Sequence, residues 1–321
     1  MFESPGVPSK LPGDATLGGV RVVVSRSLRV ILNGGKSLGK RFETAVEAVR
    51  RRGHAIDVQM TSQAIGAATL ARQAVEDRVD VVVAGGGDGT VNEVVNGIFA
   101  ASAEPGVTMA VLPLGSANDF ARSCDIPLRD PGEAMLLAAC AEPTEIDVGR
   151  VNRRYFLNAV IAGLGAAATF RTSELMKRHL GGAAYGVTGM LSAFCPAAYP
   201  VRVWTSDGVE ERPVALIAVA NGRCAGGVRI APRAKLSDGM LDLLSVPAFS
   251  MAKWPALLAD ICTMAYREPT FVRYEQHEWV EIDALGELPI SPDGERLFAS
   301  ELRISVLKRR LPFALPPTAL A

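Results

Sequence analysis

The sequence predicts an α/β domain built on a parallel sheet, followed by a second domain that is rich in β-strands. The length of 321 residues is the first observation, because one hydrophobic core usually serves roughly 100–200 residues. The second is the alternation of short β-branched runs with helical periods from about residue 21 to residue 151, which is typical of repeated βαβ units. The third is the change after Arg150, where most apolar runs become strand-like.

The first half contains one clear helical period. Arg41–Arg52 places its apolar residues on one face and is followed by Gly53, which favours the end of a helix there. A second helix is expected from Thr90 onward. Strands are expected at Leu28–Asn33, His54–Met60, Val79–Ala84, Val107–Leu112 and Thr144–Val151.

In the second half, strand patterns alternate less often with helical patterns, and the sequence predicts a series of strands joined by turns. Asp207-Gly208 is a hairpin signal between two of them. Helical patterns interrupt the series at Thr169–His179, Tyr185–Phe194 and Met251–Tyr266. The strands are expected at Tyr155–Gly163, Pro200–Asp207, Val209–Asn221, Gly239–Val246, Glu278–Ala284 and Glu301–Leu307.

These patterns divide the chain into four parts. Residues 1–20 are expected to form a flexible N-terminal extension, 21–150 the α/β domain and 151–307 the β-rich domain. Residues 308–321 are expected to form a C-terminal tail that returns to the first domain.

Composition narrows the classes of function. Thirty-four basic residues balance thirty-four acidic ones, which argues against a nucleic-acid partner, because such binding needs an excess of positive charge. The five cysteines are far apart and predict reduced thiols rather than a zinc site. No apolar run approaches the roughly 18–20 residues of a membrane-spanning helix, and the N-terminus lacks the apolar core of a secretory signal, so a cytoplasmic location is expected.

A run of glycines follows the strand expected to end at Ala84. The turn Gly85-Gly86-Gly87-Asp88-Gly89 precedes the helix expected from Thr90. Glycines expose backbone N–H groups, and a helix N-terminus carries partial positive charge, so this segment could hold a phosphate. The alternative is a tight turn in which Asp88 and Thr90 act only as helix caps.

Polar residues also follow the next strand, within Leu112–Arg122. Gly115 and Ser116 offer backbone and hydroxyl donors, while Asn118 and Asp119 could hold a substrate or cap the helix that follows. Successive β–α turns open at the same edge of a parallel sheet. The two loops are therefore expected to converge.

Two further motifs lie in the β-rich half. Asn221–Asp242 contains Asp238-Gly239, whose carboxylate and carbonyl oxygens suit magnesium, although a simple turn is the alternative. Ser291–Glu295 is also a plausible turn, and Glu295 could accept a proton from a substrate hydroxyl.

Together, the four motifs resemble the signature of the diacylglycerol kinase, sphingosine kinase and bacterial lipid kinase superfamily. The likeness is strongest to the bacterial YegS-type lipid kinases, in Leu112–Ala121, in Asn221–Gly227 and in the opening Ile31-Leu32-Asn33-Gly34. The resemblance extends from about Leu28 to the C-terminus. It implies a nucleotide-binding α/β domain similar to NAD kinase and phosphofructokinase, and a β-sandwich lipid-substrate domain.

The resemblance also implies roles for individual residues. Glu295 matches the proton acceptor, and Asp88 is expected to act in catalysis as well as in nucleotide binding. Asp238 matches the metal ligand, together with the backbone of Lys235 and Met240, with Mg²⁺ as the expected ion and Ca²⁺ as the alternative. The positions expected to bind ATP are Thr61, Gly86, Gly87, Asp88, Gly89, Thr90, Val91, Asn92, Glu93, Gly115, Ser116, Asn118 and Asp119.

Two positions depart from the pattern of the family. Ser116 stands where many relatives have threonine, which keeps the hydroxyl. Asn33-Gly34-Gly35-Lys36-Ser37 stands where many have Asn-Pro-x-Ser-Gly, which removes a proline constraint while Lys36 and Ser37 still offer phosphate donors.

The sequence therefore predicts an ATP- and magnesium-dependent lipid kinase that acts on phosphatidylglycerol, diacylglycerol or a similar lipid alcohol. Its partner would be the inner membrane surface, which it would contact peripherally. The candidate contacts are the basic clusters Lys177–His179 and Lys308–Arg310. The alternative for each cluster is that its charges are only solvated. A soluble NAD-kinase-like enzyme and a non-catalytic nucleotide- or lipid-binding module remain as other hypotheses. The sequence does not indicate the oligomeric state.

Overall fold

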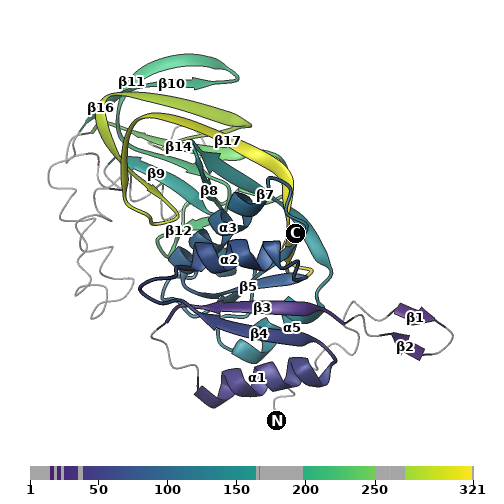
Figure 1. Ribbon diagram of the computed structural model, residues 1–321. Coiled ribbons are helices and arrows are strands. Elements are labelled where there is room, and N and C mark those ends of the chain that lie inside the picture. The colour runs from purple at the N-terminus through teal and green to yellow at the C-terminus, as the bar shows by residue number, and fades with distance from the viewer. Residues whose placement is uncertain are drawn as a thin grey trace, which may run out of the picture.

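A computed structural model describes most of the chain. It covers residues 25–34, 39–163, 198–249 and 272–319, the short stretches 15–17 and 20–22, and the single positions 166, 253, 257 and 260. The helical patterns at 169–179 and 185–194, nearly all of 251–266, and the positions Lys36 and Ser37 lie outside the described residues. Figure 1 shows an α/β part below and a β-rich part above it.

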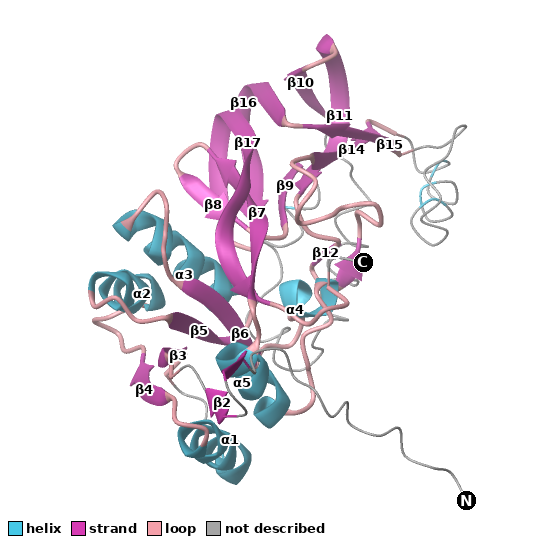
Figure 2. Ribbon diagram, turned by 90° about the vertical axis from the view of Figure 1, so that its right-hand side faces the viewer, coloured by secondary structure: helices cyan, strands magenta, loops and turns pink. Residues whose placement is uncertain are grey.

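The α/β part is a parallel sheet with helices on both faces (Figure 2). Its strands lie in the order β4-β3-β5-β6, and each neighbouring pair is parallel. Two apolar clusters fill the space on either side, one with α1 and α5 and the other with α2, α3 and α4. The elements are β3 (Ser27–Leu32), α1 (Gly39–Arg51), β4 (Ala55–Met60), α2 (Ala67–Glu76), β5 (Val81–Gly86), α3 (Asp88–Ala101), β6 (Thr108–Pro113), α4 (Asp119–Ser123) and α5 (Pro131–Cys140).

The β-rich part is antiparallel and has its own apolar core. The hairpin predicted at Asp207-Gly208 is confirmed between β10 and β11, with Gly208 at φ +132°. The strands are β7 (Pro143–Val151), β8 (Arg154–Phe156), β9 (Ala159–Gly163), β10 (Tyr199–Thr205), β11 (Gly208–Ala220), β12 (Cys224–Ala225), β13 (Val228–Arg229), β14 (Leu241–Pro247), β15 (Arg273–His277), β16 (Trp279–Pro292) and β17 (Leu297–Ala314); β1 (Ala15–Leu17) and β2 (Val20–Val22) pair separately near the N-terminus.

The β-rich part differs from the prediction in several strands, and the strand expected to end at Ala284 continues as β16 to Pro292. The strand expected at Tyr155–Gly163 is divided into β8 and β9, because the N–H groups of Leu157 and Asn158 donate to the Asp293 carboxylate instead of to a neighbouring strand. The strand β15 was not predicted, because its sequence, Arg-Tyr-Glu-Gln-His, contains no alternation of apolar residues.

The last strand, β17, joins the two parts of the molecule. The sequence analysis ended a strand at Leu307, whereas β17 continues through a bulge at 308–310 to Ala314. Along this length it pairs with β16 and β7, and Phe313 then pairs with Met109 of β6. The segment expected to be a tail is therefore a strand as far as Ala314.

Phe313 is a suitable position at which to test this connection. Its ring is fully buried and packs against Phe120 with 4.7 Å between the ring centroids. We expect Phe313→Ala to lower the free energy of unfolding by about 3–5 kcal/mol, measured by urea denaturation, because it leaves a cavity where the end of β17 packs into the core of the α/β part. Phe298→Ala, at a ring that is 60% exposed, is the matched control and should cost much less. Equal losses would contradict this account of β17.

Candidate active site

The glycine run forms a shorter turn than the sequence predicted. Gly85 and Gly86 belong to β5 and pair with Leu112 and Pro113, and α3 already begins at Asp88, so Gly87 alone makes the turn. A Cβ at Gly85 would overlap the Leu32 side chain, and one at Gly86 would overlap Thr90. These two glycines therefore permit close packing. The strand was predicted to end at Ala84 and the helix to begin at Thr90, and each of these boundaries is wrong by two residues.

The two loops converge as predicted. A Cβ built on Gly87 would lie 3.1 Å from the Cα of Gly115, and one built on Gly115 would lie 2.5 Å from the Cα of Gly87. Asn118, at φ +50°, braces the second loop: its Oδ1 accepts from the Gly115 N–H at 2.8 Å and its Nδ2 donates to the Gly115 carbonyl. The Gly115 N–H is thus already bonded within the loop, while Ser116 is exposed beside it.

Asp88 and Asp119 connect three of the motifs. Asp88 Oδ1 accepts from the Asp119 N–H at 2.7 Å, and Asp119 Oδ1 accepts from the Gly227 N–H at 2.8 Å. Burial, with smaller contributions from the charges of Asp88 and Asp293, raises the pKa of Asp119 to about 6. Burial also raises the pKa of Asp88. Two carboxyl groups are therefore held close together at the N-termini of α3 and α4.

Several other predicted nucleotide positions make internal contacts. Thr61 Oγ1 accepts from the Gly34 N–H at 2.9 Å, which joins the ends of β4 and β3. Glu93 Oε2 accepts from the Ala67 N–H at 3.0 Å and so caps α2, while Val91 is buried in the core. A role for these residues toward a nucleotide stays a prediction.

The fourth motif meets the first through Asp293. This carboxylate is buried and accepts from Asn92 Nδ2 at 3.2 Å, as well as from the N–H groups of Leu157, Asn158 and Ala159. Burial raises its pKa to about 6 against the opposing effect of these hydrogen bonds. Sequence reasoning assigned Asp293 no role of its own, although an aspartate in Ser-Pro-Asp-Gly-Glu was the available signal.

Glu295, the predicted proton acceptor, lies two residues beyond Asp293 at the surface. Its Oε2 accepts from Arg154 Nη1 at 2.6 Å, and both side chains are partly exposed. Arg154 comes from β8, whose next residue, Tyr155, is bonded to Asn96 of α3. Arg154 was missed by the sequence analysis because a basic residue near a predicted strand gives no signal of such a partner.

The metal loop, residues 233–242, contains the three predicted metal ligands and is held by a buried aspartate, Asp147. Its Oδ2 accepts from the Gly239 N–H at 2.6 Å, its Oδ1 accepts from the Arg309 N–H at 2.7 Å, and its own N–H donates to the Leu236 carbonyl. The aliphatic chain of Lys308 packs over Gly239. Little in the sequence pointed to Asp147, which is one of two acidic residues, with Glu145, in the predicted strand.

The chemistry of this loop fits a hard divalent cation. Asp238 is exposed, and its Oδ1 accepts from the Met240 N–H at 3.0 Å. Partial desolvation raises the pKa of Asp238, and the nearby Asp147 carboxylate adds to the rise; a bound cation would offset the repulsion between these two carboxylates. Among the described residues, no group of three or more His, Cys, Asp or Glu side chains could hold a metal, so carbonyl oxygens and water would have to complete the coordination.

Two buried asparagine side chains at the junction of the motifs have oxygen atoms that could still accept a hydrogen bond. The Oδ1 atoms of Asn158 and Asn221 have no hydrogen-bond partner in the described structure. Asn221 Nδ2, by contrast, donates to the carbonyls of Asp147 and Leu157. Unpaired acceptors of this kind are suited to water or to a bound hydroxyl.

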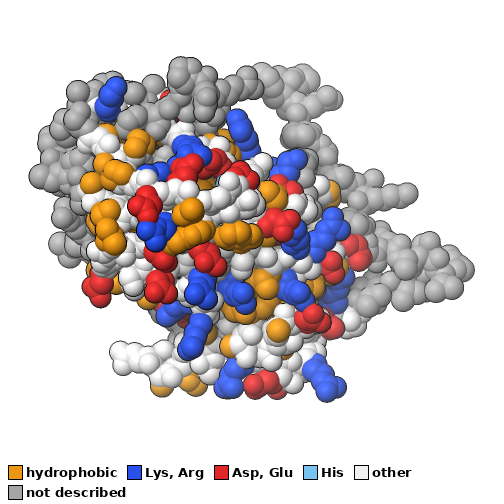
Figure 3. All heavy atoms as spheres, turned by 90° about the horizontal axis from the view of Figure 1, so that it is seen from above, with side chains coloured by type: hydrophobic (Ala, Val, Ile, Leu, Met, Phe, Trp, Pro, Cys, Tyr) orange, Lys and Arg blue, Asp and Glu red, His pale blue; other side chains and the backbone are white. Residues whose placement is uncertain are grey.

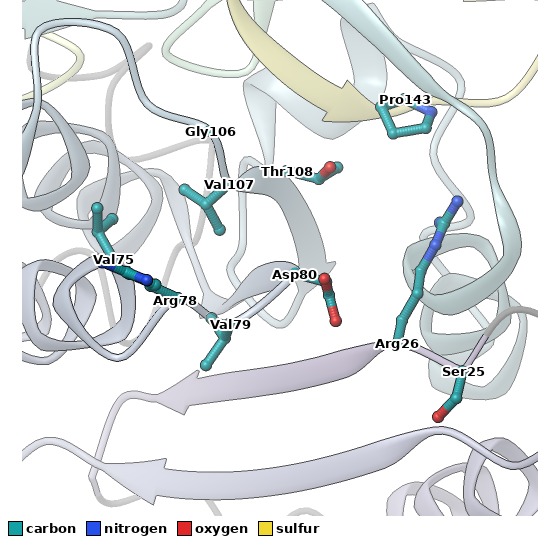
Figure 4. A pocket seen from close by; sticks show the side chains of 10 residues that line it. All are labelled: Ser25, Arg26, Val75, Arg78, Val79, Asp80, Gly106, Val107, Thr108 and Pro143. Atoms are coloured by element: carbon teal, nitrogen blue, oxygen red, sulfur yellow. The ribbon is translucent and has the colours of Figure 1, made fainter.

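A cavity of about 400 Å³ lies at the opposite, amino-terminal edge of the parallel strands (Figure 4). The main polar side chains in it already have internal partners. Arg26 donates to the Ala141 carbonyl at 2.7 Å, and Asp80 accepts from the Ser27 N–H at 2.6 Å. The cavity is therefore separate from the loops that carry the four motifs.

The candidate membrane contacts are only partly described. Lys308 pairs with Glu278 at 2.6 Å and Arg310 pairs with Glu104, so two of the three charges in Lys308–Arg310 have acidic partners, while Lys177–His179 lies outside the described residues. Figure 3 shows basic, acidic and apolar side chains interspersed on the upper face. None of the helices in the described part of the chain is long and apolar enough to cross a membrane.

Comparison with known proteins gives a consistent result along most of the chain. Residues 27–151 match the family described as "Diacylglycerol kinase catalytic domain", and residues 158–315 match "YegS C-terminal NAD kinase beta sandwich-like domain". A protein from Chromohalobacter salexigens named "Probable lipid kinase YegS-like" is 38% identical over 89% of this chain and 92% of its own length. A protein of the same name from Shewanella frigidimarina is 35% identical over 90% and 94%, respectively.

A solved structure shares the fold. A crystal structure described as a diacylglycerol kinase from Bacillus anthracis superposes with a TM-score of 0.70, covering 92% of this chain and 98% of that one. The two sequences are 21% identical, so this likeness shows the common architecture alone.

The buried carboxyl of Asp119 should make stability depend on pH. Because its pKa is raised from 3.8 to about 6, its contribution to stability is fully present below the lower value and is lost as the pH rises through the higher one. Asp119→Asn removes this cost and keeps an oxygen for the Gly227 N–H. We expect urea denaturation to show the variant gaining about 1–2 kcal/mol over the parent between about pH 5 and about pH 7.5.

Asp125→Asn, at an exposed carboxylate in the same segment, is the control for the loss of one charge. If both variants show the same pH response, burial of Asp119 is not its cause.

Proposed function

Because the chain belongs to the YegS-like lipid kinases and carries a diacylglycerol kinase catalytic domain, we propose that it transfers the γ-phosphate of ATP to a lipid hydroxyl with the help of Mg²⁺. The observation that carries the proposal is the convergence of the motifs: Gly87 lies against Gly115, Asp119 bonds to Gly227, and Asn92 bonds to Asp293. Four segments that are far apart in the sequence thereby meet at one junction.

In this proposal ATP binds where the two glycine loops meet. Gly87 and Gly89 flank the N-terminus of α3, where backbone N–H groups and the helix dipole favour phosphate. A Cβ at Gly89 would meet nothing within 4 Å, so this backbone is approachable from outside. The exposed Ser116 adds a hydroxyl at the edge of the same site.

Mg²⁺ would be held by the Asp238 carboxylate with the carbonyls of Lys235 and Met240, and Ca²⁺ is the alternative ion for this oxygen donor set. When bound, the cation would supply charge neutralisation for the phosphates. The protein's own part is to keep the loop in place through the hydrogen bond from the Gly239 N–H to Asp147.

Glu295 acts as the proton acceptor. The lipid hydroxyl oxygen attacks the γ-phosphorus, its proton passes to the Glu295 carboxylate, and the bond to the β-phosphate oxygen breaks to release ADP. Arg154 occupies Oε2 of Glu295 and leaves Oε1 available for this proton.

The acceptor in this proposal is a glycerol lipid with a free hydroxyl, either phosphatidylglycerol or diacylglycerol. Such a lipid stays in its bilayer, so the enzyme would bind peripherally at the inner membrane surface from the cytoplasm. The alternative of a soluble acceptor rests on the likeness of the second domain to the NAD kinase β-sandwich.

The test is a transfer assay with γ-labelled ATP and Mg²⁺ in which detergent-dispersed lipid and NAD compete as acceptors. We expect label in the lipid phase, and Glu295→Gln should lower kcat by about 10²–10⁴-fold because it removes the proton acceptor. Glu301→Gln, at an exposed carboxylate on β17, is the matched control. Label in NAD would identify the soluble alternative, and full turnover by Glu295→Gln would exclude that residue as the acceptor.

Gly89→Ala separates nucleotide binding from folding. The added methyl meets open space and lies in a helix, so the free energy of unfolding should change by no more than about 1 kcal/mol. It would, however, obstruct a phosphate at the helix N-terminus, and we expect ATP affinity measured by calorimetry to fall about tenfold or more. Gly106→Ala, an equally open position outside the four motifs, is the control and should bind ATP like the parent.

A further inference from the structure

One tyrosine joins the two ends of the metal loop, which spans residues 233–242. Tyr274 lies on β15, and its hydroxyl accepts from the Arg233 N–H at 3.3 Å. The same hydroxyl donates to the carboxylate of Asp242. Arg233 begins the loop and Asp242 is the second residue of β14, where the loop ends, so a single oxygen atom links the two ends.

The environment of this hydroxyl makes the connection strong. Asp242 is 1% exposed and accepts a second hydrogen bond from Gln276 Nε2 at 3.2 Å. The guanidinium carbon of Arg233 lies 5.1 Å from the centroid of the Tyr274 ring, which adds a cation–π contact at the other end. A hydrogen bond from a hydroxyl to a buried carboxylate is among the stronger ones in proteins.

A further anchor holds the middle of the loop. Asp147 accepts from the Gly239 N–H and donates to the Leu236 carbonyl. Gly239 has φ +71°, a conformation in which the chain reverses sharply. With its middle bonded to Asp147 and its ends bonded to Tyr274, the loop is restrained on both sides of the three proposed ligands.

We propose that Tyr274 is a positioning residue for divalent-cation binding. Its hydroxyl fixes the span of the loop and thereby aligns the Lys235 and Met240 carbonyls with the Asp238 carboxylate. Oxygen ligands that are ordered before the cation arrives bind it more tightly, because less conformational entropy is lost on binding. The inference rests on the proposed cation site and goes beyond it by naming a residue that does not touch the ion.

Tyr274→Phe tests the proposal, since it removes both hydrogen bonds and keeps the ring beneath Arg233. We expect Mn²⁺ binding, followed by electron paramagnetic resonance without nucleotide, to weaken about fivefold to twentyfold. The Mg²⁺ concentration for half-maximal activity should rise by a similar factor, while kcat at saturating Mg²⁺ stays near the parent value. The melting temperature without metal should fall by only a few degrees.

Gln276→Ala is the matched control, because it removes a donor to the same Asp242 carboxylate without linking the ends of the loop. It should bind Mn²⁺ like the parent. If it weakens binding as much as Tyr274→Phe, the hydrogen bonding of Asp242 alone is responsible and the proposal is overturned. Arg233→Pro removes the backbone donor at the other end of the loop, so it should weaken Mn²⁺ binding as Tyr274→Phe does. It also keeps the proposal testable if Tyr274→Phe folds poorly.

The outcomes separate this inference from the proposed function. A parent protein that binds Mn²⁺ while Tyr274→Phe binds it equally well would overturn the inference alone. A parent protein that transfers phosphate but shows no Mn²⁺ binding would remove both the cation site and the role of Tyr274. Weaker binding confined to the two loop-end variants would support both.

Discussion

The backbone ladder between β7 and β17 is the constraint on which the arrangement of the site depends. β17 pairs with β16 in the second domain, with β7 along most of its length, and with β6 in the first domain. Asp147 lies on β7 and accepts from the backbone of Arg309 within the bulge of β17. Since the same carboxylate holds the metal loop, the ladder fixes that loop relative to the glycine loops at the ends of β5 and β6. A continuous strand allows less relative motion than a flexible linker between two domains would.

The site is assembled from buried carboxylates that the surrounding protein makes costly to ionise. Burial is the main cause of the raised pKa of Asp119, Asp293 and Asp242. Each of them nevertheless accepts hydrogen bonds from a segment distant in the sequence. Burying these carboxylates lowers the stability of the protein. Their oxygens also accept hydrogen bonds from particular loops, and these bonds determine which loops meet. The same carboxylates account for the break between β8 and β9 and for the fixed ends of the metal loop.

The roles of the motif residues divide between holding the site together and facing its ligands. Asn92, Glu93, Asn118 and Thr61 all form hydrogen bonds within the protein, and the sequence analysis had expected all four at a nucleotide. Gly89, Ser116 and Asp238 are exposed, and Glu295 is partly exposed, so these motif residues are open to a ligand. Family motifs thus combine residues that shape a loop with residues that can reach a ligand, and spacing in the sequence does not distinguish the two.

The sequence by itself was enough to predict the α/β and β-rich halves, most strands of the sheet and helix α1, and to identify the four motifs. Periodicity and glycine placement are local properties of the chain, which is why these features could be predicted. The convergence of the glycine loops was also predictable, since parallel strands end at one edge. Only the tertiary structure decided the roles of Asp147, Arg154, Tyr274 and Asp293. Their partners are 32 to 201 positions away along the chain for the hydrogen bonds that define those roles, as with Tyr274 to Asp242 and Asp293 to Asn92. A hydrogen bond between distant segments leaves no period or spacing in the sequence, so it became visible only once β7, β15 and β17 were in place.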